Sequence, residues 1–138
     1  MKIDGACFCG KLAYEADIDE NLVGICHCRD CQVFSGSAYR MSAMTAPHNF
    51  RLTQGEPRYF DKLADSGKTR RMVFCDTCGS HLASIPLPGD EAGNFVSIRV
   101  ATAHQYHQLK PSVELYCASR VPWLSDQPGT VAFERMPE

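Results

Sequence analysis

The sequence has little net charge and no long apolar segment, and each absence excludes a class of protein. Its formal net charge is -2, and basic residues gather only at 68–71, so we expect neither nucleic acid nor an anionic membrane as its partner. No apolar run approaches the roughly 20 residues that a transmembrane helix needs. The first residues also lack the apolar stretch of a secretory signal, and we therefore expect a cytoplasmic protein.

The sequence also lacks internal repeats, low-complexity tracts and any Pro/Gly/Ser-rich linker long enough to separate domains. A chain of 138 residues can bury a hydrophobic core without help from disulfides. We therefore expect residues 1–138 to form a single domain.

Short strand-like segments dominate the chain and are separated by turn residues. They are rich in Val, Ile, Phe and Tyr and often alternate apolar with polar side chains, which is typical of strands. The nine segments are 11–18, 21–28, 38–44, 58–63, 69–75, 81–85, 95–101, 113–117 and 130–134. Only residues 29–34 favour a helix, which should end near Gly36. The pattern predicts a mainly β fold with an antiparallel arrangement and one short helix.

Cysteine, in contrast, is abundant. The chain has eight cysteines, although we expect it in the cytoplasm, where thiols are normally kept reduced. Seven of them lie in three groups with gaps of one or two residues. Cysteines this close on a strand cannot easily bridge each other, whereas such clusters are what metal coordination requires. The groups are Cys7-x-Cys9, Cys26-x-Cys28-x-x-Cys31 and Cys75-x-x-Cys78.

The first and third groups predict one closed zinc site. A strand delivers Cys75, a two-residue turn returns Cys78, and Gly79 follows where a tight metal knuckle needs a positive φ. If residues 7–9 are extended, Cys7 and Cys9 face the same side and supply two more thiolates. Four thiolates make a structural site. The alternative is that these cysteines are simply buried small hydrophobes.

The second group predicts an open zinc site. Cys26 and Cys28 lie on one face of a strand, and Cys31 falls in the first helical turn, where the helix dipole favours a thiolate. Three ligands leave one tetrahedral position for water or substrate, as in catalytic zinc sites. The alternative is that Cys117 supplies a fourth ligand and closes the site. His27 should face away, as a supporting or surface group.

Zinc with three thiolates carries a net charge of about -1, so it should acidify water less than a three-histidine site. Such a centre suits a substrate thiol, which binds as a fourth sulfur ligand and loses its proton. The second group therefore predicts thiol chemistry.

The order of these motifs resembles the glutathione-dependent formaldehyde-activating enzyme family over nearly the whole chain. The match includes Ser35-Gly36-Ser37 after the second group, Ser80-His81-Leu82 after the third, and Pro122-Trp123. The resemblance implies a zinc-stabilised antiparallel β-tent. It also implies two zinc ions per chain, a structural one at Cys7, Cys9, Cys75 and Cys78 and a catalytic one at Cys26, Cys28 and Cys31.

The activity that the resemblance implies is a carbon–sulfur lyase reaction, which adds glutathione or a similar thiol to formaldehyde, or reverses that addition. The expected partners are thus a small thiol and a small aldehyde. Backbone amides of Ser35, Gly36 and Ser37, with Arg29 or Arg40, are candidates to hold the carboxylates of the thiol. The competing hypothesis is a non-catalytic zinc scaffold that binds a thiol or a protein, which a closed second site would favour.

Overall fold

The computed structural model describes residues 1–137 and is mainly β. Its strands, in chain order, are β1 (Lys2–Ala6), β2 (Ala13–Asp17), β3 (Val23–Cys26), β4 (Arg40–Thr45), β5 (Phe50–Gln54), β6 (Arg58–Leu63), β7 (Thr69–Phe74), β8 (His81–Pro86), β9 (Val96–Arg99), β10 (Val113–Leu115) and β11 (Val131–Ala132). The helix α1 spans Arg29–Ser35, and short 3-10 helices are η1 (Pro47–Asn49), η2 (Val100–Thr102), η3 (Tyr106–Gln108) and η4 (Cys117–Ser119). No helix within residues 1–137 is long and apolar enough to cross a membrane.

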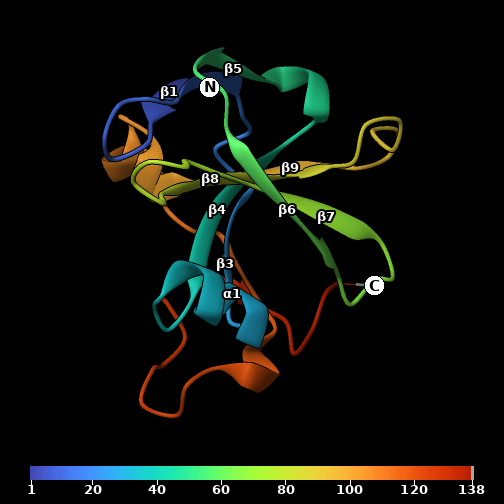
Figure 1. Ribbon diagram of the computed structural model, residues 1–138. Coiled ribbons are helices and arrows are strands. Elements are labelled where there is room, and N and C mark those ends of the chain that lie inside the picture. Colours follow the sequence, from blue (N-terminus) through green and yellow to red (C-terminus); the bar gives the residue numbers. More distant parts are fainter. Residues whose placement is uncertain (138) are drawn as a thin grey trace.

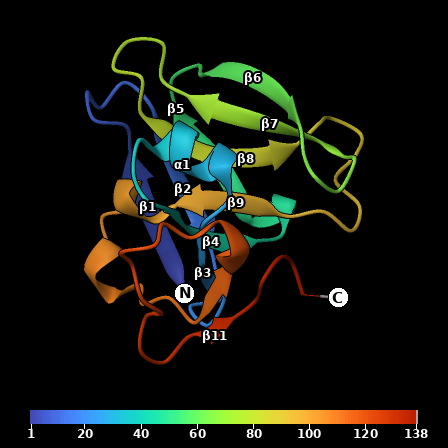
Figure 2. The ribbon, with the colours of Figure 1, turned by 90° about the horizontal axis from the view of Figure 1, so that it is seen from below.

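The strands form two sheets. The smaller has the order β1-β2-β5, and the larger has the order β11-β10-β3-β4-β9-β8-β7-β6. The predicted antiparallel arrangement is confirmed for most neighbours. The exceptions are the pairs β3–β10 and β10–β11, which are parallel. Figure 1 shows α1 beside the ends of β3 and β4, and in Figure 2, the view from below, α1 lies in front of the strands.

The hydrophobic core lies between the two sheets. It joins side chains of the smaller sheet, such as Ile3 and Tyr14, to those of the larger, such as Ala43, Ala83 and Ile98. These five side chains are at most 3% exposed. Burying apolar surface contributes about 25 cal/mol per Å², so this layer anchors one face of the larger sheet and leaves its other face for polar side chains.

Each of the nine predicted strand segments overlaps a strand, and two of these strands, β4 and β8, extend one residue beyond the predicted end. The helix begins at the predicted residue and ends one residue later than predicted. Gly36 terminates it with φ 65°, and the Gly36 amide donates to the carbonyls of Gln32 and Val33. The sequence analysis missed β1 and β5, which flank β2 in the smaller sheet.

Candidate metal centres

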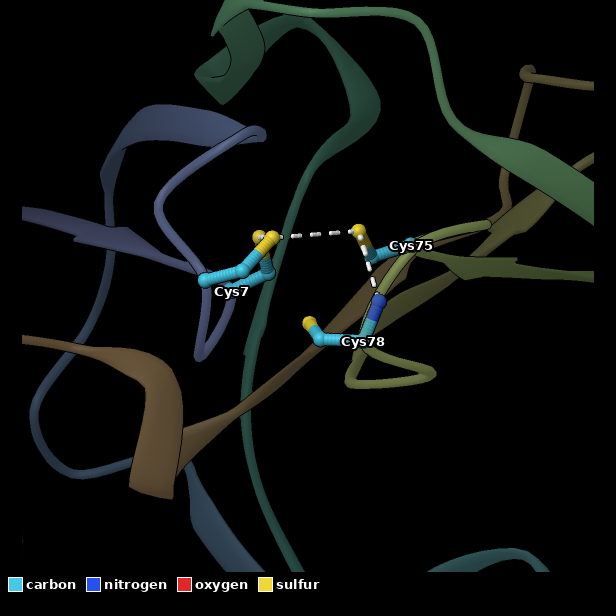
Figure 3. A group of neighbouring side chains, drawn as sticks. Cys7, Cys75 and Cys78 are labelled. Atoms are coloured by element: carbon cyan, nitrogen blue, oxygen red, sulfur yellow. Dashed lines mark hydrogen bonds between the residues drawn. The ribbon is translucent and has the colours of Figure 1, made fainter.

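Four thiols from two distant parts of the chain converge at one point. The Sγ atoms of Cys7, Cys9, Cys75 and Cys78 all lie within 4.8 Å of one another (Figure 3). The Cys7–Cys9 distance is 3.6 Å and the Cys9–Cys75 distance is 3.7 Å. Zinc–sulfur bonds of about 2.3 Å in a tetrahedron separate the sulfur atoms by about 3.8 Å. The spacing and the all-sulfur donor set therefore fit a zinc ion.

Two tight turns build this group. The Cys7 amide donates to the Leu12 carbonyl at 3.0 Å, and the Gly10 amide donates to the Cys7 carbonyl at 3.1 Å. Cys7 and Cys9 thus lie in a turn after β1, and the expected extended backbone at residues 7–9 was wrong. In the second turn the Gly79 amide donates to the Cys75 carbonyl at 3.0 Å, and Gly79 has the expected positive φ, 77°.

Backbone and hydroxyl donors favour the charged form of two of these sulfur atoms, those of Cys75 and Cys78, whereas the pKa of Cys9 is raised to about 11. The amides of Cys78 and Thr77 lower the pKa of the Cys75 thiol. The Ser80 hydroxyl and amide lower the pKa of Cys78 to about 5. Hydrogen bonds to the charged form stabilise that form, so this turn is prepared for thiolate ligands.

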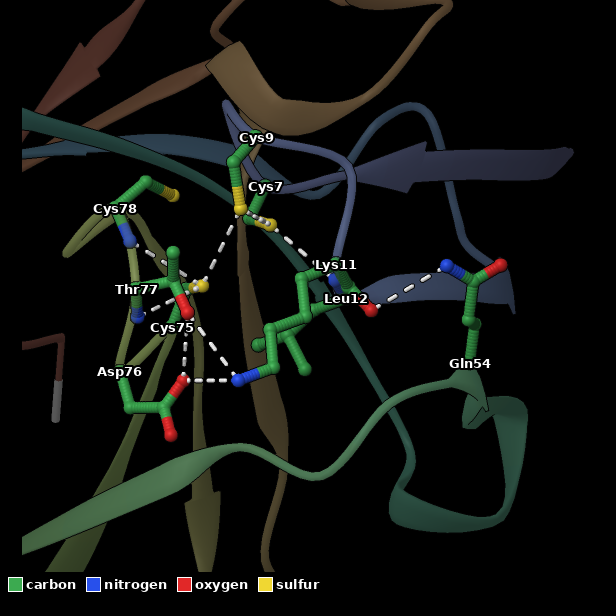
Figure 4. Close-up of polar contacts among 9 residues, drawn as sticks. All are labelled: Cys7, Cys9, Lys11, Leu12, Gln54, Cys75, Asp76, Thr77 and Cys78. Atoms are coloured by element: carbon green, nitrogen blue, oxygen red, sulfur yellow. Dashed lines mark hydrogen bonds and ion pairs between the residues drawn. The ribbon is translucent and has the colours of Figure 1, made fainter.

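An ion pair holds the two turns together beside the thiols (Figure 4). Lys11 Nζ lies 2.7 Å from the Asp76 carboxylate and 3.2 Å from the Thr77 hydroxyl. On the other side, the Phe8 amide donates to the Ser80 hydroxyl at 3.0 Å. These contacts join residues more than sixty positions apart, and they position the four thiols relative to each other.

Three further thiols form a second group at the start of α1. The Sγ atoms of Cys26, Cys28 and Cys31 lie within 4.8 Å of one another. Cys26 ends β3, Cys28 is the N-cap of α1, and Cys31 lies in its first turn. Cys28 Sγ accepts the Cys31 amide at 3.3 Å, as the oxygen of a serine or aspartate cap does. Hydrogen bonds from the Cys26 and Cys31 thiols lower the pKa of Cys28, and three sulfur donors also fit zinc.

The second thiol group opens into a cavity of about 590 Å³ that includes all three of its cysteines, which we call the thiol cavity. Five basic residues line it against two acidic ones, and one of the acidic residues, Asp30, is paired with Lys62 at 2.5 Å. The lining therefore favours an anionic occupant. The basic residues are Arg29, Arg40, Lys62, Lys68 and Arg70, and the other acidic residue is Asp65.

Cys117 does not belong to this group. It begins η4, and Arg120 Nη2 donates to its Sγ at 3.1 Å. Its sulfur lies instead with ligand atoms of His27 and Glu114. His27 is fully buried, and its Nε2 is 2.8 Å from Glu114 Oε1, so its side chain anchors the segment between two thiols instead of lying at the surface.

The residues proposed from the sequence to hold the substrate divide between two cavities. Arg29 lines the thiol cavity, and its Nη1 donates to Gln32 Oε1 at 2.6 Å. Ser35 and Ser37 line a neighbouring cavity of about 560 Å³, and Gly36 is not among the lining residues of either. Arg40 lines both cavities.

Several lining residues were missed by the sequence analysis, among them Lys62, Lys68, Arg70 and Tyr116. They come from strands and loops more than thirty positions after the Cys26-x-Cys28-x-x-Cys31 motif in sequence. No local pattern marks them, because only the pairing order of the strands brings them to the thiols.

A family model described as glutathione-dependent formaldehyde-activating enzyme matches residues 2–119. The crystal structure of a Rhodobacter sphaeroides protein resembles this fold with a TM-score of 0.55 at 19% identity, over 72% of this chain and 85% of that one. That identity supports the fold alone. No curated protein matches the sequence significantly. Because the family model covers most of the chain, the chain belongs to the glutathione-dependent formaldehyde-activating enzyme family.

Proposed function

We propose that the protein is a zinc-dependent carbon–sulfur lyase that adds a small thiol, such as glutathione, to a small aldehyde, such as formaldehyde, or reverses that addition. The observation that carries this proposal is the group of three thiols in a cavity lined mainly by basic residues. Glutathione is an anionic thiol, so both its sulfur and its charge suit the cavity. Cys117 lies outside the group, which favours an enzyme over a closed scaffold.

Two zinc ions per chain are part of the proposal. The structural ion would be held by Cys7, Cys9, Cys75 and Cys78, whose four thiolates would fill all of its ligand positions. Cys26, Cys28 and Cys31 would hold the second ion, which would keep the sulfur of the substrate as a nucleophilic thiolate.

The reaction then balances without a redox partner. The thiolate lone pair forms a bond to the carbonyl carbon, the π pair of the carbonyl moves to oxygen, and that oxygen takes up a proton. Tyr116 lines the cavity, and burial together with the nearby Asp65 raises the pKa of its hydroxyl. The phenol therefore keeps its proton at neutral pH. Its hydroxyl donates to Asp65 Oδ2 at 3.5 Å, and by turning from that carboxylate it would donate to the developing oxyanion.

Substrate contacts follow from the two cavities. Arg29 would bind a carboxylate of a thiol that fills the thiol cavity. A tripeptide that extends past Arg40 would reach Ser35 and Ser37 beside the neighbouring cavity. We therefore still propose that the backbone amides of residues 35–37, Gly36 included, bind part of the substrate. We also propose a cytoplasmic location, since the chemistry depends on reduced thiols.

The first test is calorimetric binding of glutathione to protein that carries two zinc ions per chain. Saturable binding that Cys31→Ser abolishes, and that the matched control Cys117→Ser retains, would support the proposal. Exchange between free formaldehyde and its glutathione adduct, followed by NMR, should then be faster with enzyme than without it. If a protein with both zinc ions binds no thiol, the enzyme proposal fails and the non-catalytic scaffold is favoured.

A further inference from the structure

The face of the larger sheet that points away from the hydrophobic core is polar and carries the first of the three thiols. Strand pairing sets Cys26 opposite Arg40 and Ser42 opposite Arg99. It also sets Ser97 opposite Ser84, and Ser84 opposite Met72. Paired residues project from the same face of a sheet, as do residues two apart on a strand. One continuous face therefore carries Cys26, Arg40, Ser42, Arg99, Ser97, Ser84, Met72 and Arg70.

This polar face is covered instead of lying in water. Ser42, Ser84 and Ser97 are 4–6% exposed, and Arg99 is 7% exposed. Arg70 lines the thiol cavity, Arg99 lines the neighbouring cavity, and Arg40 lines both. Arg40 thus lies where the two cavities adjoin, with Arg70 in the lining of one and Arg99 in the lining of the other.

These arginines lack partners for part of their hydrogen-bonding capacity. Arg99 Nη1 donates to the Ser42 hydroxyl and the Ser97 carbonyl, and Arg70 Nη2 donates to Ser84. Within residues 1–137, the buried atoms Arg40 Nε, Arg70 Nη1 and Arg99 Nη2 have no hydrogen-bond partner. None of the three side chains forms an ion pair with a described carboxylate.

Unpaired charges are costly when they are removed from water. Arg99 is buried and Arg40 and Arg70 are partly buried, so three arginines without a described counter-ion indicate a place for an anion. Burial and the charge of Arg40 lower the pKa of Arg70, to about 10, and also lower that of Arg99. The three cysteines supply part of the compensation. A divalent ion bound by the three thiolates would have a charge of about -1 and would balance one of the three arginine charges. A substrate thiolate would balance the second, and one more anion is needed for the third.

We propose that Arg40, Arg70 and Arg99 form a carboxylate-binding site beside the three thiols, and that the enzyme therefore selects thiols that carry a carboxylate. This inference rests on the proposed function and deepens it, because it assigns the residues that would distinguish a carboxylate-bearing thiol from a neutral one. Guanidinium groups bind carboxylates through paired, charge-assisted hydrogen bonds. A free oxyanion such as phosphate would satisfy the same donors, and the experiment separates the two sources.

The experiment compares two thiols that differ only in charge, 3-mercaptopropionate and 3-mercaptopropionamide, by calorimetry on the zinc-replete protein. The wild type should bind the anionic thiol at least about tenfold more tightly than the amide, because one charge-assisted contact supplies that much. Arg40→Gln should reduce the ratio to near one while the amide still binds, and Arg40→Lys should restore part of it. Arg51→Gln is the matched control, since Arg51 is exposed and pairs with Glu15.

The zinc content and unfolding curve of every variant are measured first, and Arg70→Gln replaces Arg40→Gln if the latter does not fold. Equal binding of the two thiols by the wild type, or a preference that survives both arginine changes, would overturn the assignment and leave the proposed function intact. Failure of both thiols and of glutathione to bind would overturn the proposed function, and this assignment with it. Phosphate binding that is lost in the arginine variants, together with equal affinity for the two thiols, would show that the site binds a free anion. That result would also overturn the assignment.

Discussion

Replacing Glu114 by alanine should strongly destabilise the protein, because this carboxylate is the centre of a buried network. Glu114 and His27 are both 0% exposed. The carboxylate lies 2.8 Å from His27 Nε2, 2.7 Å from the Thr130 hydroxyl and 3.0 Å from the Gln127 amide. Arg120 Nη2 lies 3.5 Å away. The network thus ties the thiol-bearing segment to β10 and to the chain near its C-terminal end.

The size of the effect follows from burial. Removing one partner of a buried ionic network costs about 3–5 kcal/mol, which is a large share of the about 5–15 kcal/mol that stabilises a typical domain. Glu114→Gln keeps an acceptor oxygen and similar volume but loses the charge, so it should cost less, about 1–3 kcal/mol. Because His27 lies between Cys26 and Cys28, Glu114→Ala should also lower the zinc content of the second site.

Urea unfolding at constant free zinc measures both variants, and the pH dependence tests the origin of the effect. Burial alone would raise the pKa of Glu114, but hydrogen bonds from His27, Thr130 and Gln127 outweigh it and lower the pKa from its ordinary value of 4.5. A lowered carboxyl pKa gives stability that is complete above the unfolded value and is lost as the pH falls through the folded one. The gap between wild type and Glu114→Gln should therefore stay constant near neutrality and close only below about pH 4.5.

The reasoning would be refuted by a cost for Glu114→Ala below about 1 kcal/mol, the size of an ordinary exposed contact. A gap that already closes between pH 7 and 6 would also contradict it, because a carboxylate with a lowered pKa does not titrate there.

Three further predictions concern the metal centres and one close backbone contact. Cys75→Ser should remove one of the two proposed zinc ions and destabilise the fold, since metal binding at a structural site contributes to the folding free energy; metal analysis measures the first effect and thermal unfolding the second. Cys117→Ser should leave the zinc content unchanged, because Arg120 contacts that sulfur and the three-thiol group excludes it; loss of an ion would contradict this. Gly5→Ala should cost about 2–3 kcal/mol in urea unfolding, because its Cβ would lie 2.2 Å from the Thr102 carbonyl oxygen.

Features with a local cause were predictable from the sequence. The helix end depended on Gly36, whose left-handed backbone is favourable for glycine. The turn at Cys75–Cys78 follows from a two-residue spacing that metal knuckles require. Cys7 and Cys9 could be grouped with Cys75 and Cys78 because a tetrahedral zinc site needs four ligands and the second pair supplies only two. The backbone at residues 7–9, however, forms a turn and not the expected extended segment.

Features that depend on neighbours were not predictable in the same way. In β1 the residues Asp4 and Gly5 weaken a strand pattern, and only pairing with β2 makes the segment extended. In β5 the short alternation of Phe50 and Leu52 gives too few residues to distinguish a strand from a loop, and its pairing with β2 again decides its conformation.

The polar face of the larger sheet shows the same limit at the site itself. The alternation in β9 places Ile98 toward the core and Ser97 and Arg99 on the opposite face, which for an ordinary sheet would be the solvent face. All four residues of β9 are buried instead, because two cavities and the covering segments replace bulk water on that side. The sequence therefore indicates which side chains share a face but not the medium that the face contacts. That difference changes an arginine from a surface charge into a specific hydrogen-bond donor. The proposed selectivity for carboxylate-bearing thiols therefore depends on the order of the strands as much as on the cysteine motifs.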